Sequence, residues 1–111
     1  MTINIKATNI DLTDSLKTYV QDKLGGLTKF IKHFDEEGVA ELWVEVGRTT
    51  KHHHKGDVYR AEADLRLPHK ILRAVEINDD LRVAIDVLKH KIQLEIDKYK
   101  TRTSKRPKRI K

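Results

Sequence analysis

Two periodicities of apolar residues alternate along the chain. Apolar and polar residues alternate in three short stretches, residues 3–7, 40–46 and 59–67, which is the pattern of strands with one buried face. A fourth stretch, residues 71–77, also predicts a short strand, but its sequence does not settle which side faces the core. After the first stretch, and again after the fourth, apolar residues recur every three or four positions, which predicts amphipathic helices. The predicted order is strand, helix, strand, strand, strand, helix.

The first predicted helix begins after Thr13, a good N-cap, with Asp14 in its first turn. Its apolar stripe consists of Leu16, Val20, Leu24, Leu27, Ile31 and Phe34. Gly25 and Gly26 interrupt the stripe, and each costs up to about 1 kcal/mol in a helix relative to Ala. We expect the helix to bend there, or a second short helix to start.

The last predicted helix is capped by Asn78, with Asp79 and Asp80 in its first turn. Its apolar stripe consists of Leu81, Ile85, Leu88, Ile92, Ile96 and Tyr99. The periodicity stops at Thr101. We therefore expect a single domain of residues 1–101, followed by a basic, disordered tail of residues 102–111.

This order predicts an α+β fold: a β-α-β-β-β-α chain forming a four-stranded mixed sheet with two helices packed on one face. The first two strands should be parallel, because a helix connects them, and the others antiparallel. The open face of the sheet should carry Glu41, Trp43, Glu45, Arg60, Glu62, Asp64 and Arg66. Modules that stack bases on a sheet need several aromatic side chains and little negative charge, so we expect nucleic acid to bind elsewhere.

Charge is distributed unevenly along the 111 residues. The net charge is +6 and the isoelectric point is about 9.6. Residues 89–111 contain ten Lys and Arg against two acids, whereas the preceding residues are nearly neutral. A cationic end of this kind indicates a polyanionic partner.

The helix surfaces supply the candidate phosphate contacts. In the last helix, Arg82, Lys89 and Lys100 lie away from the apolar stripe, whereas Lys91 and Lys98 flank it. The first helical region adds Lys17, Lys23, Lys29 and Lys32. The candidate RNA-binding residues are Lys23, Lys29, Arg82, Lys89, Lys91, Lys98, Lys100 and Arg102. Lysine and arginine bind phosphates without reading sequence, so a folded RNA could be recognised by its shape.

Other chemistries have little support. The chain has no cysteine, so it has neither a disulfide framework nor a thiolate site. His52 and His54 would share a face of an extended segment, but a solvated loop explains them better than a metal site. Helix capping explains Asp79 and Asp80, and no nucleotide-binding or catalytic motif is present. We expect no enzyme activity, no cofactor and no small-molecule substrate. No apolar run approaches the roughly 18 residues that span a membrane, and from the first residues we expect no secretory signal peptide.

Several stretches resemble the ribosome hibernation promoting factor and ribosome-associated inhibitor family, also called sigma-54 modulation proteins. Residues 78–86, Asn-Asp-Asp-Leu-Arg-Val-Ala-Ile-Asp, resemble the family's start of the last helix, although Arg82 stands where an aromatic residue is usual. Lys91-Ile92, Lys98-Tyr99-Lys100, Leu72 to Glu76, and the first-helix residues Tyr19-Val20, Lys23-Leu24 and Leu27 also match. The resemblance covers roughly residues 3–100 in order.

The resemblance implies a cytoplasmic, non-enzymatic protein, monomeric when free. It would bind ribosomal RNA in the decoding channel of the small subunit and inhibit translation under stress or in stationary phase. It also implies that Lys23, Lys29, Lys91, Lys98 and Lys100 contact ribosomal RNA phosphates. The long form of the family has a second domain, for which this chain is too short.

Two alternatives remain open at this stage. The sheet face with Trp43 could serve a protein partner such as a sigma factor. The helices could instead form a generic double-stranded RNA-binding module, which would bind plain duplexes as well as it binds the ribosomal subunit.

Overall fold

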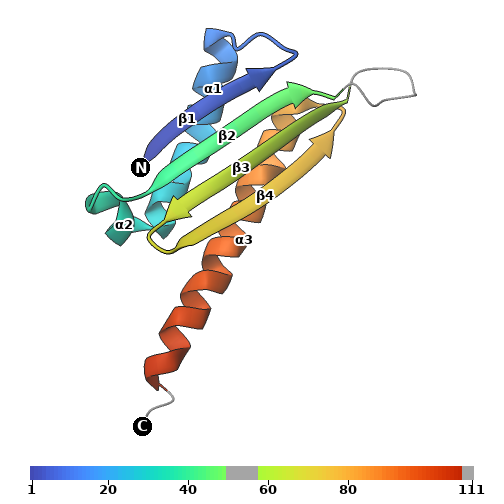
Figure 1. The fold of residues 1–111 in the computed structure, drawn as a ribbon. Coiled ribbons are helices and arrows are strands. Elements are labelled where there is room, and N and C mark those ends of the chain that lie inside the picture. Colours follow the sequence, from blue (N-terminus) through green and yellow to red (C-terminus); the bar gives the residue numbers. More distant parts are fainter. Residues whose placement is uncertain (50–57, 109–111) are drawn as a thin grey trace.

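The computed structural model describes residues 1–49 and 58–108 and, within 103–108, the backbone alone (Figure 1). Its strands are β1 (Thr2–Thr8), β2 (Glu41–Arg48), β3 (Tyr59–Leu67) and β4 (Lys70–Asn78). Its helical elements are α1 (Asp14–Gly25), the 3₁₀ helix η1 (Gly26–Phe30), α2 (Lys32–Glu36) and α3 (Leu81–Lys108). This confirms the predicted element order. His52 and His54 lie outside the described residues.

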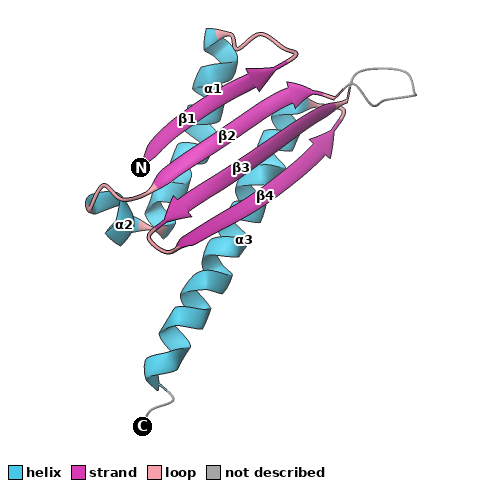
Figure 2. Cartoon of the chain, in the orientation of Figure 1, coloured by secondary structure: helices cyan, strands magenta, loops and turns pink. Residues whose placement is uncertain are grey.

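The four strands form one sheet in the order β1-β2-β3-β4 (Figure 2). β1 and β2 are parallel, with Ile5 opposite Val44, as expected for strands joined by a helical connection. β2 and β3, and then β3 and β4, pair antiparallel, so that Val44, Ala63 and Ala74 lie in one row across the sheet. The predicted mixed sheet is confirmed.

The core lies between the inner face of the sheet and α1 and α3, which cover that face (Figure 1). Leu42 and Leu65 from the sheet and Val20, Leu88 and Ile92 from the helices are fully buried. The buried residues on each element follow the predicted periodicities. Truncating one of these leucines to Ala removes well-packed atoms and typically costs 2–5 kcal/mol, roughly.

The first helical region divides at its two glycines. Thr13 caps α1 as predicted, because its hydroxyl accepts a hydrogen bond from the Leu16 amide at 3.1 Å. α1 then ends at Gly25, a short 3₁₀ helix follows, and α2 completes the connection to β2. Of the two outcomes expected at the glycines, the structure thus has the second, a new short helix.

Two features of α3 differ from expectation. Asn78 does not cap the helix. Its side-chain oxygen accepts from the Asp80 amide at 2.9 Å, and Asp80 itself accepts from the amides of Arg82 and Val83 at 3.0 and 3.2 Å. The assignment of Asn78 as N-cap was therefore wrong, because two consecutive Asx-type bonds move the helix start from 79 to 81.

The second difference concerns the C-terminal end. The backbone of α3 stays helical past Thr101 to Lys108, where the sequence pattern leads us to expect a disordered tail from residue 102. Extending an existing helix requires no new nucleus, so Lys, Arg and Thr can continue it without an apolar stripe. With 28 residues, α3 is about 42 Å long and projects beyond the sheet (Figure 1).

Candidate nucleic-acid interface

The predicted cations divide into two groups on opposite flanks of α3. We call the first group the helix seam: Lys23 of α1, Lys29 of η1, and Arg82, Lys89 and Lys100 of α3. All five lie along the line where α3 meets α1 and η1. The second group, the outer flank, consists of Lys91, Lys98 and Arg102 of α3. From the sequence, these eight residues are all candidate RNA-binding residues, whereas the structure brings together only the five of the seam.

Arg82 occupies one end of the seam, near the start of α3. Its guanidinium lies 4.7 Å from the centroid of the Tyr19 ring and donates a hydrogen bond to the Ser15 hydroxyl at 3.2 Å. Both partners belong to α1, and both are uncharged. Arg82 is thus held in place without its charge being neutralised by these contacts, which leaves it available to an anion.

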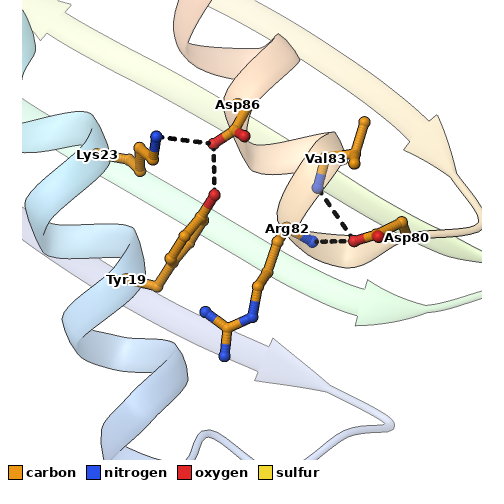
Figure 3. A network of polar contacts seen from close by, with 6 residues as sticks. All are labelled: Tyr19, Lys23, Asp80, Arg82, Val83 and Asp86. Atoms are coloured by element: carbon orange, nitrogen blue, oxygen red, sulfur yellow. Dashed lines mark hydrogen bonds and ion pairs between the residues drawn. The ribbon is translucent and has the colours of Figure 1, made fainter.

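A polar network joins α1 and α3 next to Arg82 (Figure 3). The Tyr19 hydroxyl donates to the Asp86 carboxylate at 2.7 Å. The Lys23 ammonium lies 3.6 Å from the same carboxylate oxygen. The hydrogen bond to Asp86 is the largest cause of the raised pKa of the Tyr19 phenol, followed by desolvation. Tyr19 therefore stays protonated and serves as a donor between the helices.

The middle of the seam is built on Gly26. A Cβ at this position would lie 3.1 Å from the Lys89 ammonium nitrogen and 3.6 Å from the adjacent carbon. The missing side chain therefore lets Lys89 lie across the start of η1. Gly26 has ordinary helical angles, with φ of −64°, so space rather than backbone conformation favours glycine here.

The far end of the seam is formed by η1 and the later turns of α3. Lys100 donates to the Phe30 carbonyl at 3.0 Å, and the Lys29 ammonium lies 5.3 Å from the centroid of the Phe30 ring. From Arg82 to Lys100, the α3 residues of the seam extend over about 27 Å of helix at 1.5 Å per residue. The seam is thus an extended line of cations, suited to a polyanion rather than to a single small ligand.

The outer flank has a different electrostatic character. Lys91 donates to the Val75 carbonyl at 2.9 Å and forms an ion pair with Glu76 at 2.8 Å, which ties α3 to the edge strand β4. Lys98 lies 3.4 Å from the Glu95 carboxylate. Arg102 is exposed near the projecting end of α3. Two of these three cations are therefore compensated by acids, and Lys91 also has a structural role.

The open face of the sheet is no base-stacking platform, which agrees with the sequence analysis. Trp43 is 41% exposed, but the Arg66 guanidinium lies 4.7 Å from its ring centroid. Arg60 pairs with Glu62 at 3.0 Å. The strand register adds two bases to this face, Lys6 from β1 and Arg73 from β4, and Arg73 pairs with Asp64 at 2.8 Å. Acidic and basic side chains are thus balanced on the open face. From the sequence we expected an excess of acids there, because the facing of β4 was unsettled.

Sequence reasoning missed Ser15, Tyr19 and Asp86, which contact the seam cations Arg82 and Lys23. A signal for them was present: Tyr19 and Lys23, like Arg82 and Asp86, are four residues apart and share a helix face. What the sequence could not supply was the pairing of these two faces across the helix contact.

Residues 1–49 and 58–102, whose side chains are described, hold no cluster of three or more His, Asp or Glu side chains able to hold a metal ion. In the described part of the chain, no helix combines the length and apolarity needed to cross a bilayer.

The structure is a four-stranded sheet backed by two helices, with a line of cations along the contact between the helices. The sequence model of a family described as "Sigma 54 modulation protein / S30EA ribosomal protein" matches residues 3–104. The chain belongs to this family, as the resemblance noted in the sequence predicted. The family consists of binding and regulatory proteins, not of enzymes.

Two curated relatives are named ribosome hibernation promotion factor. The protein of Lactococcus lactis subsp. cremoris (strain MG1363) is 32% identical over 106 residues, which is 94% of this chain and 52% of the relative. That of Staphylococcus aureus (strain COL) is 28% identical over 102 residues, which is 92% of this chain and 50% of the relative. The chain thus spans about half the length of these relatives.

Two solved structures share the fold. A ribosomal subunit interface protein from Coxiella burnetii superposes with a TM-score of 0.72 at 19% identity, covering 91% of this chain and 99% of that one. The Thermus thermophilus Protein Y N-terminal domain gives a TM-score of 0.67 at 25% identity, covering 89% and 99%. The low identity of the first limits its support to the fold.

Proposed function

We propose that this protein is a ribosome hibernation factor that binds ribosomal RNA of the small subunit through the helix seam. It occupies the decoding channel, where messenger and transfer RNA would lie, and inhibits translation under stress or in stationary phase. The observation that carries this proposal is the seam itself, which presents Lys23, Lys29, Arg82, Lys89 and Lys100 as one line. Family membership and the names of the relatives support the ribosome as the polyanion.

The physical basis is electrostatic. Phosphate contacts by Lys and Arg release condensed counterions, and this makes affinity fall steeply with salt. Such contacts carry no sequence information, so recognition depends on the shape of the RNA surface. A line of cations about 27 Å long along α3 fits an RNA backbone better than it fits a compact ligand.

Residues 1–101 form the ribosome-binding domain, and the basic residues from 102 onward extend its reach along RNA. The protein is cytoplasmic and monomeric when free. Of the outer flank, Arg102 and Lys98 provide secondary contacts, whereas Lys91 serves mainly to hold α3 against β4.

The test compares two triple variants with the same loss of charge. The seam variant carries Lys23→Gln, Arg82→Gln and Lys89→Gln. The control carries Arg60→Gln, Arg66→Gln and Arg73→Gln on the open face of the sheet. Co-sedimentation with purified small subunits should weaken at least about 100-fold for the seam variant, since each lost charged contact contributes over 1 kcal/mol. The slope of log affinity against log salt should flatten by about 2.7.

The control should bind nearly as well as the wild type. Equal weakening of both variants would mean that only net charge matters, and the seam would lose its assignment. A selective loss in the control would favour the alternative, a partner at the sheet face around Trp43.

A further inference from the structure

An acid lies within the line of cations. Asp86 of α3 follows Arg82 by four residues and precedes Lys89 by three, so it faces α1 from the same side of the helix. Its carboxylate is held by the Tyr19 hydroxyl at 2.7 Å and by Lys23 at 3.6 Å. Figure 3 shows it pointing into the space between the helices. The carboxylate is therefore held in a fixed position among the seam cations.

The negative charge of Asp86 reaches the solvent. Its side chain and that of Lys23 are each 45% exposed, so an RNA backbone following the seam meets a carboxylate between Arg82 and Lys89. Those two cations are seven residues apart, or about 10.5 Å along the helix. Asp86 therefore divides the line into two cationic stretches, with a weaker or repulsive site between them.

Holding the Tyr19 hydroxyl does not by itself require a negative charge at position 86. An asparagine at position 86 has nearly the same shape, and its amide oxygen could accept the same hydrogen bond from Tyr19. The ionised carboxylate differs from the amide in its charge, which pairs with Lys23 and opposes phosphate binding. A group that lowers general affinity at the centre of a binding surface is a common means of excluding wrong partners.

We propose that Asp86 is a specificity-determining residue of the seam, which disfavours regular RNA duplexes relative to the folded ribosomal surface. The strands of a duplex carry closely spaced phosphates, about one per 3.4 Å of axis on each strand in DNA, so a duplex strand lying along the seam cannot avoid Asp86. A folded RNA can present a backbone that leaves a gap at this point. This inference rests on the function proposed above.

The experiment measures two affinities for each variant: one for purified small ribosomal subunits and one for a plain RNA duplex. Asp86→Asn removes the charge and keeps the acceptor for Tyr19. Its matched control is Glu41→Gln on the open face of the sheet, where the carboxylate accepts a hydrogen bond from Trp43 at 3.4 Å and an amide oxygen could do the same. Circular dichroism and thermal unfolding verify that each variant is folded.

Asp86→Asn should raise the affinity for the duplex by about three- to tenfold, the effect of one nearby exposed charge, and change that for the subunit by less than twofold. The ratio of the two affinities therefore falls, whereas Glu41→Gln leaves it unchanged. An unchanged duplex affinity in Asp86→Asn, or an equal gain for both RNAs, would overturn the inference. If wild-type protein does not bind subunits at all, the proposed function fails, yet the duplex measurement still decides whether Asp86 repels phosphate.

Discussion

The two flanks of α3 carry the same residue types but differ in what holds them. On the seam side, Arg82 contacts a hydroxyl and an aromatic ring, and Lys89 lies over a glycine. On the outer flank, Lys91 and Lys98 pair with Glu76 and Glu95. A cation held by neutral groups keeps its full charge for attracting phosphate, whereas the charge of a cation paired with an acid is partly neutralised. We therefore expect the seam flank of the helix to bind RNA and the outer flank to stabilise the fold.

The largest expected effect is a difference in ribosome binding between variants of the two flanks. The double variant Lys89→Gln with Lys100→Gln should weaken association with the small subunit by about 30-fold, because two phosphate contacts are lost. Lys91→Gln with Lys98→Gln removes the same charge from the outer flank and should weaken it by only about threefold. Both are measured by co-sedimentation at one salt concentration. Equal losses of affinity in the two double variants would contradict the different roles of the two flanks.

The next largest expected effect is a difference in stability between variants of the two flanks. Lys91→Met keeps the aliphatic stem but removes the bonds to Val75 and Glu76, and should cost about 1 kcal/mol because the site is partly exposed. In thermal unfolding this corresponds to a decrease of about 4 °C in Tm. Lys89→Met on the seam is the control and should leave Tm within about 1 °C. A larger loss for Lys89 than for Lys91 would contradict these roles.

The smallest expected effect concerns Gly26, the residue over which Lys89 lies. Gly26→Ala adds a methyl group that meets only the end of the Lys89 side chain, so the lysine shifts while the backbone stays in place. Stability should be unchanged or rise by up to about 1 kcal/mol, since Ala restricts the unfolded chain more than Gly. Subunit affinity should fall about two- to threefold, measured as above. Unchanged affinity would show that the position of Lys89 is not critical.

The alternating and helical periodicities were enough to predict the fold. Each strand has one buried face, so residues such as Leu42 and Leu65 mark the inner side of the sheet without any knowledge of their neighbours. The start of α3 was harder, because Asn78 and Asp80 are both good caps and only the backbone path decides between them. The end of α3 was missed because helix propagation leaves no periodic signal once the apolar stripe has ended.

The candidate site was predictable in its residue types but not in its grouping. The spacing of Arg82, Lys89 and Lys100 places them on one face of a helix, yet it does not tell which element that face meets. Only the packing of α1 against α3 shows that Tyr19 and Asp86 meet there. Likewise, nothing in the sequence around Gly26 indicates that the lysine crossing it comes from 63 positions further along the chain.

The most direct test of the central claim is the salt dependence of binding between the wild-type protein and purified small subunits, with a plain RNA duplex as competitor. Binding through the five seam cations predicts stoichiometric association whose log affinity falls with log salt at a slope of about −3 to −5, and which excess duplex does not displace. A slope near zero, or full displacement by the duplex, would contradict the assignment of the seam as a ribosome-specific RNA surface.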